Sequence, residues 1–309
     1  MNYLETEGFQ NPLLQPPPVN ATTVAYRGVR LAYHLLYGLI LAMSFPLLGP
    51  ASRCALQRYW SRALLHILNV RLETVGPLPQ TREQGTLLVA NHISWLDVFI
   101  INAVTPASFV AKSEVRSWPL IGLLCRLTRT VFIERSLRRD TLRANWAITS
   151  TLIRGECVAL FPEGTSTDGS HVRPFHSSLL QCSIDAGTRV QPIAIRYHNG
   201  TGLRSADACY IGDMTLVQSL LNILRSRSLH ARLVFLPELS SLDKNRRVLA
   251  NEAYLAICTA LDRLPTQALP APRNNRAHHL PNRPASSIQS AYSLLLDPLI
   301  GEAKHPHRL

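Results

Sequence analysis

The chain of 309 residues is long enough to bury a substantial core. Apolar residues make up 46% of it and charged residues only 17%, while the net charge is +12, which argues against a disordered acidic protein and favours an anionic partner such as a phosphate-bearing ligand, membrane lipid or nucleic acid. The six cysteines show no CxxC spacing, so we expect reduced core thiols and neither a zinc site nor a disulfide framework.

The N-terminal part of the chain is predicted to associate with a membrane. Residues 1–26 contain three consecutive prolines and lack the positively charged start of a signal peptide, so we expect a flexible segment there. Leu31–Leu48 is an apolar run of about the minimum length for a membrane span, and both crossing the bilayer and entering one leaflet stay open. Residues 27–70 are therefore expected to form membrane-associated helices.

Apolar residues recur at helical spacing across Ala51–Val70, with arginines on the remaining faces. This pattern is typical of an amphipathic helix that lies on an anionic membrane surface, and a surface helix packed on its own domain is the alternative. Arginines flank Leu31–Leu48 and are more numerous after it, which favours a cytoplasmic location for the long C-terminal part. We expect an inner-membrane protein whose globular domain faces the cytoplasm.

Residues 71–262 are predicted to form an α/β domain with a mixed, largely parallel sheet flanked by helices, because short apolar runs alternate there with helical patterns. Ligand sites on such sheets lie at the carboxyl ends of strands. Residues 263–309, rich in Pro and Arg, are expected to be a flexible tail. The predicted strands are Arg71–Val75, Thr86–Ala90, Ser108–Ala111, Thr130–Ile133, Cys157–Phe161, Val190–Ile195, Ala208–Ile211 and Arg232–Leu236. The predicted helices include Trp95–Ala103, Thr141–Arg154, Ser178–Ala186 and Arg246–Leu261.

His92 and Asp97 directly follow the predicted strand Thr86–Ala90. Ser94 with an acid three positions later predicts a helix that begins at Trp95 with Ser94 as its N-cap. His92 then lies in the preceding turn, where its ring can fold back toward the Asp97 carboxylate. A histidine held by a carboxylate acts as a general base, here on a hydroxyl of the substrate, because no obvious protein nucleophile lies beside it. Simple helix capping by Asp97 is the alternative.

Two further predicted strands end in polar residues. Thr130–Ile133 is followed by Arg135, whose planar guanidinium suits a phosphate or a carboxylate, although a plain surface arginine is the alternative. Cys157–Phe161 is followed by Glu163 and Gly164. The glycine lets backbone amides approach a ligand, and the carboxylate can accept hydrogen bonds from substrate hydroxyls or simply be solvated.

In this order, these blocks resemble the glycerolipid acyltransferase family, of the bacterial 1-acylglycerol-3-phosphate (lysophosphatidic acid) acyltransferase type. The resemblance covers roughly residues 70–236 and rests on four blocks: Asn91–Asp97, Val131–Arg135, Phe161–Thr165 and Val190–Ile195. It implies transfer of a fatty acyl chain from an acyl-CoA or acyl-carrier-protein thioester to the free hydroxyl of a lysolipid. The thioester is then a co-substrate, a membrane is the setting, and no cofactor, metal or nucleic acid is implied.

The resemblance also implies roles for individual residues. His92 removes the hydroxyl proton as the oxygen attacks the thioester, Asp97 orients His92, and Arg135 holds the phosphate of the acceptor. No acyl-enzyme is required. The full set expected to bind the acceptor is Arg135, Glu163, Gly164, Thr165 and Arg173.

The chain departs from the family pattern at the head-group position. Members acting on glycerol phosphate lipids often carry Arg where this chain has Ser166, and further basic residues after the following Pro-Phe, where this chain has His176, Ser177 and Ser178. The expected acceptor is 1-acylglycerol-3-phosphate, with another lysolipid such as lyso-ornithine lipid as the alternative. A thioesterase or serine hydrolase would need a Gly-x-Ser-x-Gly elbow, which the sequence lacks. A non-enzymatic membrane or nucleic-acid binding protein is the alternative from another class.

Overall fold

The computed structural model describes residues 17–79, 85–118, 121–128, 130–134 and 138–264. The strands are β1 Val70–Val75, β2 Leu87–Ala90, β3 Ser108–Lys112, β4 Val131–Ile133, β5 Val158–Leu160, β6 Val190–His198 and β7 Leu229–Phe235. The α-helices are α1 Ala21–Ser44, α2 Pro50–Ile67, α3 Asp97–Asn102, α4 Ile121–Leu127, α5 Arg138–Ile153, α6 Gln181–Asp185, α7 Leu216–Arg225 and α8 Arg246–Arg263, with short 3₁₀ helices η3 Phe45–Leu47, η4 Ser113–Ser117 and η5 Ser177–Leu180. Residues 265–309 of the predicted flexible tail and residues 1–16 of the predicted flexible N-terminus lie outside the described residues. Residues 21–26 form the start of α1, and Arg263 is the last residue of α8.

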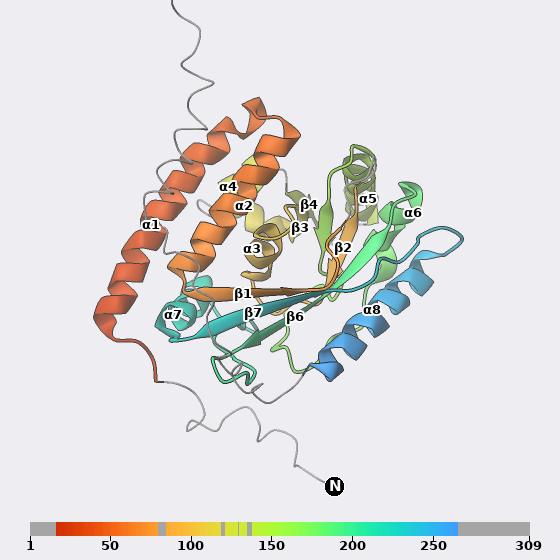
Figure 1. Ribbon diagram of the computed structural model, residues 1–309. Coiled ribbons are helices and arrows are strands. Elements are labelled where there is room, and N and C mark those ends of the chain that lie inside the picture. Colours follow the sequence, from red (N-terminus) through yellow and green to blue (C-terminus); the bar gives the residue numbers. More distant parts are fainter. Residues whose placement is uncertain (1–16, 80–84, 119–120, 129, 135–137, 265–309) are drawn as a thin grey trace, which may run out of the picture. The chain divides into compact units, whose positions relative to one another are not determined.

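The seven strands form one sheet in the order β1-β7-β6-β2-β5-β3-β4 (Figure 1). All the neighbouring pairs are parallel except β6 and β7, which are antiparallel. The predicted α/β class with a mixed, largely parallel sheet is therefore confirmed. The parallel strands β2 and β5 are neighbours, so the segments that follow them meet at the same edge of the sheet.

Each face of the sheet carries its own hydrophobic core, because successive side chains along a strand point to opposite faces. Leu88 and Ala90 of β2 pack in a core with residues of α1, α2, α3 and α7. Leu87 and Val89 pack in a second core with residues of α5, α6 and α8. A strand buried on both faces reads as a continuous apolar run, which is why β2 is recognisable in the sequence.

Helices α1 and α2 lie side by side and pack against the rest of the fold (Figure 1). His34 and Trp60 stack with ring centroids 4.5 Å apart. Gly38 is required there, because an added Cβ would lie 2.5 Å from the Trp60 indole nitrogen. Arg27 of α1 is buried and donates hydrogen bonds to the carbonyls of Leu224 and Ser226 at the end of α7, at 2.9 and 2.8 Å.

Helix α2 favours the alternative that the sequence left open for Ala51–Val70. It contacts α1, α3 and β1, and Leu64 and Leu65 are buried in this packing. Its predicted apolar face is therefore largely used within the fold, although Tyr59 remains exposed. The prediction that residues 27–70 form membrane-associated helices is not tested by these contacts and stays a prediction.

Several predicted elements differ from the structure. The strand expected at Ala208–Ile211 is wrong: this segment forms a turn, and the Tyr210 N–H donates to the Ile93 carbonyl at 3.0 Å instead of joining a ladder. Helix α3 begins at Asp97 and not at Trp95, and Ser94 is not its N-cap. Strand β6 runs three residues beyond the predicted Ile195. The last of these differences bears on the site described next.

Candidate active site

The turn after β2 brings His92 and Asp97 together. His92 Nδ1 lies 2.8 Å from Asp97 Oδ2. The Asp97 side chain is fully buried, whereas the His92 side chain is 22% exposed. Because an ionised carboxylate only accepts hydrogen bonds, Nδ1 donates, and in the neutral ring Nε2 keeps its lone pair. This is the arrangement that a general base requires.

Asp97 also holds the turn itself, which is why α3 starts two residues later than predicted. Its Oδ2 accepts the backbone N–H groups of Ile93 and Ser94, at 2.7 and 2.9 Å. Its Oδ1 accepts the hydroxyl of Tyr197 at 2.7 Å. Burial and the neighbouring Asp97 carboxylate raise the pKa of Tyr197 well above its ordinary value, so this hydroxyl stays protonated and remains a donor.

Glu163 lies in the segment after the neighbouring strand β5 and holds the backbone of His92. Its Oε1 accepts the His92 N–H at 2.6 Å, and its Oε2 accepts the Arg173 N–H at 2.7 Å. Burial raises the pKa of the Glu163 carboxyl and outweighs the effect of these two donors. The Thr167 N–H donates to the His92 carbonyl at 2.9 Å, so both backbone polar groups of His92 are held. This geometry favours a positioning role for Glu163, and direct binding of a substrate by it stays a prediction.

The other predicted binding residues have different positions. Gly164, with a φ of +80°, and Thr165 line the same cavity as His92. Arg173 is exposed, and its side chain is not part of the cavity lining. Arg135 lies outside the described residues. The substrate-binding roles of these residues stay predictions.

His92 lies at an apolar cavity of about 640 Å³. Its ring stacks on Phe161, with centroids 4.2 Å apart, and Phe161 stacks in turn near Phe109 at 6.0 Å. Side chains from α1, α2, η4 and α4 form much of the wall, including Leu35, Leu56, Val115 and Leu124. The space next to His92 is therefore suited to a long apolar group and disfavours water.

The chain is similar to known acyltransferases. A family model described as Acyltransferase matches residues 69–196. A 1-acyl-sn-glycerol-3-phosphate acyltransferase from Neisseria meningitidis serogroup B is 41% identical over 174 residues, which cover 56% of this chain and 68% of the relative. The chain belongs to the acyltransferase family. The matched segment includes all the described residues that hold His92, apart from Tyr197.

Other relatives of this acyltransferase are named for a different acceptor. A lyso-ornithine lipid O-acyltransferase from Pseudomonas aeruginosa is 36% identical over 209 residues, covering 68% of this chain and 79% of the relative. One from Rhodobacter capsulatus is 33% identical over 267 residues, covering 79% and 94%. The crystal structure of a 1-acyl-sn-glycerophosphate acyltransferase from Thermotoga maritima superposes with a TM-score of 0.58 at 19% identity, covering 79% of this acyltransferase and 95% of that chain, and this supports the fold.

Two residues of the site were missed in the sequence. Tyr197 reaches Asp97 from a part of β6 that the sequence did not predict as strand. Asn91 joins β2 to β6 through its side chain, which donates to the Ile195 carbonyl at 3.0 Å and accepts the Ile195 N–H at 2.7 Å. The alternation of Ile193, Ile195 and Tyr197 is the sequence signal that could have revealed Tyr197, because it places the tyrosine on the core face of a longer strand.

Replacing Tyr197 by Phe is expected to lower kcat about tenfold with little change in KM. The substitution removes one hydrogen bond to a buried carboxylate, worth about 1.5–3 kcal/mol, while Tyr197 is fully buried and does not line the cavity. Steady-state kinetics of the two enzymes measure the effect. The matched control is Tyr26→Phe on the exposed face of α1. Unchanged kcat in Tyr197→Phe, or a change in KM alone, would contradict this role.

Proposed function

We propose that this acyltransferase moves a fatty acyl chain from an acyl-CoA or acyl-carrier-protein thioester to the free hydroxyl of a lysolipid. His92 Nε2 takes the hydroxyl proton as the oxygen attacks the thioester carbonyl. The carbon–sulfur bond then breaks, and the imidazolium returns the proton to the departing thiolate. Asp97 orients the His92 ring and stabilises the imidazolium that exists between these two proton transfers. The thioester acts as a co-substrate, and the proposal includes no cofactor.

One observation carries this proposal: His92, held by Asp97, lies at an apolar cavity. A fatty acyl chain is the substrate group that such a lining accommodates, because its burial is favourable by about 0.8 kcal/mol per CH₂. A serine hydrolase is disfavoured by the position of Ser94, which is fully buried. The Ser94 hydroxyl accepts the Leu96 N–H at 3.3 Å and is not presented to the cavity.

We propose 1-acylglycerol-3-phosphate as the acceptor, with lyso-ornithine lipid as the second candidate. The Neisseria meningitidis relative, at 41% identity, supports 1-acylglycerol-3-phosphate. Arg135 supplies a cation for the phosphate of this acceptor. The second is favoured by the relatives matched over most of their length. Ser166 also favours it, because its hydroxyl donates to the Tyr210 carbonyl at a position where the family pattern has an arginine.

We further propose that the protein lies in one leaflet of the inner membrane, with its catalytic domain in the cytoplasm. α1 with η3 is long and apolar enough to cross a membrane, with a mean hydropathy of 1.3. However, the face of α1 that carries Arg27 packs against the domain, and the opposite face forms an apolar stripe. The exposed side chains of this stripe are Tyr26, Val29, Tyr33, Leu36, Tyr37, Ile40, Met43 and Leu47. A helix docked on one side and apolar on the other suits an interfacial position.

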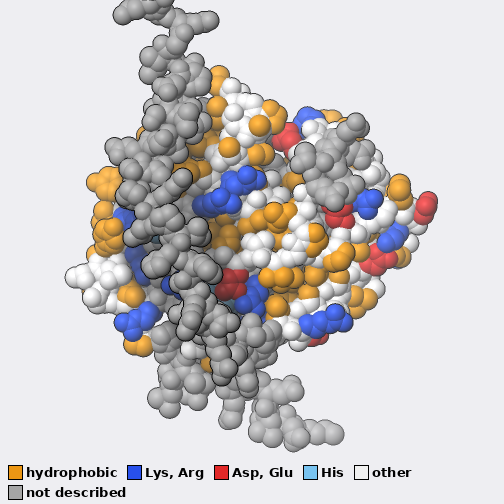
Figure 2. All heavy atoms as spheres, viewed as in Figure 1, with side chains coloured by type: hydrophobic (Ala, Val, Ile, Leu, Met, Phe, Trp, Pro, Cys, Tyr) orange, Lys and Arg blue, Asp and Glu red, His pale blue; other side chains and the backbone are white. Residues whose placement is uncertain are grey.

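On the face seen in Figure 2, the described residues offer no organised basic surface for a nucleic acid. On the face seen in Figure 2, Lys and Arg side chains are spread among hydrophobic ones and do not form a continuous stripe. The net charge of +12 is instead consistent with attraction to anionic lipid and to a phosphate-bearing substrate.

His92→Ala is expected to lower acyl transfer about 10²- to 10⁴-fold, because general base catalysis is lost. The measurement is transfer from one labelled acyl thioester to a panel containing 1-acylglycerol-3-phosphate, lyso-ornithine lipid and other lysolipids. Ser94→Ala is the matched control in the same turn and is expected to retain transfer. Full activity in His92→Ala would refute the mechanism, and release of free fatty acid that needs no lysolipid would refute the reaction class. The preferred lysolipid decides between the two acceptors.

The double variant Tyr33→Ser with Ile40→Ser is expected to bind vesicles of anionic phospholipid several-fold less tightly than the wild type. Both residues lie on the exposed stripe of α1, two helical turns apart, so the change removes buried apolar area at the interface. Vesicle flotation measures the bound fraction. The control is Val248→Ser with Leu255→Ser, which are exposed at the same spacing on α8. Equal loss in both double variants would contradict a membrane-facing α1.

A further inference from the structure

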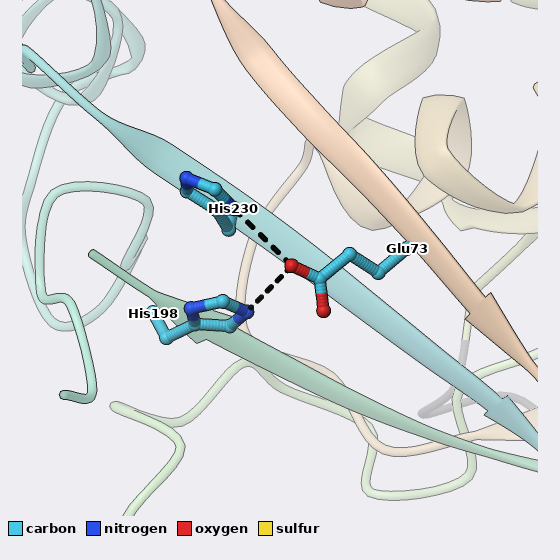
Figure 3. Close-up of side chains that lie close together, drawn as sticks. All are labelled: Glu73, His198 and His230. Carbon is cyan, nitrogen blue, oxygen red and sulfur yellow. Dashed lines mark hydrogen bonds and ion pairs between the residues drawn. The ribbon is translucent and has the colours of Figure 1, made fainter. Parts of the chain in front are cut away.

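The side chains of Glu73, His198 and His230 converge on one another (Figure 3). They come from the three adjacent strands β1, β6 and β7, and the register pairs His198 with His230 and Glu73 with Arg232. Glu73 Oε1 lies 3.2 Å from His230 Nδ1 and 3.4 Å from His198 Nε2. The three facing atoms all lie within 4.8 Å of one another.

The outward atoms of all three side chains are held by neighbours. His198 Nδ1 lies 3.0 Å from the Asn199 carbonyl, and His230 Nε2 lies 3.1 Å from the Ser228 hydroxyl. Arg232 donates to Glu73 Oε2 at 2.7 Å. A metal-binding histidine almost always has its second nitrogen engaged in this way, which fixes the tautomer and the direction of the ring.

The tautomer of His198 creates an electrostatic mismatch that a cation would remove. A carbonyl only accepts hydrogen bonds, so His198 Nδ1 carries the proton that it donates to Asn199. In a neutral ring, Nε2 then points a lone pair at the carboxylate oxygen of Glu73. His198 is 6% exposed, and its Nε2 has no hydrogen-bond partner among the residues that the structure describes. Two acceptors facing each other at a largely buried histidine call for a positive charge between them.

We propose that Glu73, His198 and His230 bind a divalent first-row transition-metal ion, with Zn²⁺ as the ion tested. Two imidazole nitrogens and one carboxylate oxygen are ligands that Zn²⁺ accepts in tetrahedral sites, with the fourth position left for water. The separations of 3.2 and 3.4 Å match neighbouring ligands about 2.0–2.2 Å from a central ion. This assignment departs from the sequence, where the cysteine spacing indicated no zinc site.

The metal would have a structural role in this position. His198 follows Tyr197 directly, and adjacent residues of a strand point to opposite faces, so the ion lies behind the residue that holds Asp97. It would tie together β1, β7 and β6 at the end of the sheet that carries the site. Arg232 also brings a positive charge to the carboxylate, so we expect weaker binding than at thiolate zinc sites.

Thermal unfolding of the full chain in detergent, after removal of metal by a chelator, tests the site with ZnCl₂ as the probe. At a Zn²⁺ concentration about 100 times Kd, the wild type is expected to gain about 5–10 °C in Tm. His198→Ala, His230→Gln and Glu73→Gln are expected to lose this gain, each compared with its own zinc-free Tm, so that a less stable variant remains informative. His66→Ala, an exposed histidine on α2, is the control and keeps the gain.

Substitution with Co²⁺ identifies the ligands independently of activity. The proposal requires an absorption spectrum of a nitrogen and oxygen site, without a thiolate charge-transfer band, that disappears in His198→Ala. No rise in Tm with Zn²⁺ in the wild type would overturn the proposal. An equal rise in the three ligand variants, or a thiolate band from the free cysteines, would overturn it as well, because either result places the ion elsewhere.

Discussion

The buried carboxylate of Asp97 is the interaction on which the site depends. It accepts hydrogen bonds from the His92 ring, from two backbone N–H groups of the turn, and from Tyr197. A charge without solvent exposure is tolerated only because these four donors surround it. The same four bonds join the turn after β2 to the end of β6. Loss of this carboxylate would therefore affect both the local fold and the orientation of the base.

The sheet supplies the rigidity that the turn lacks. Glu163 after β5 and Asn91 after β2 both use their side chains to hold backbone groups of neighbouring segments. The apolar wall from α1, α2 and α4 then closes the space beside His92. Polar side chains thus position the base, while helices from the N-terminal part provide the apolar environment. This division explains why a chain of low charge content still builds a precise polar site.

The sequence predicted the strands whose residues are buried on both faces, and it missed the parts of β6 and β7 where polar residues alternate with apolar ones. Strands β2 and β5 read as apolar runs and were placed within one or two residues. The end of β6 and the start of β7 were missed, because Arg196, His198 and His230 interrupt the apolar pattern on the outer face. Those missed residues include Tyr197 and two of the proposed metal ligands. The false strand at Ala208–Ile211 has the opposite cause, since Ala208 and Cys209 are buried without joining the sheet.

The protonation of the His92 ring is the most direct measure of the central claim. Nitrogen-15 NMR of histidine-labelled protein distinguishes the two neutral tautomers, and the His92 signal is assigned from its absence in His92→Gln. The geometry predicts that the neutral form of the ring carries its proton on Nδ1, donated to Asp97, and leaves Nε2 unprotonated. A neutral ring with the proton on Nε2 would contradict it, because that nitrogen could not then accept the proton of a substrate hydroxyl.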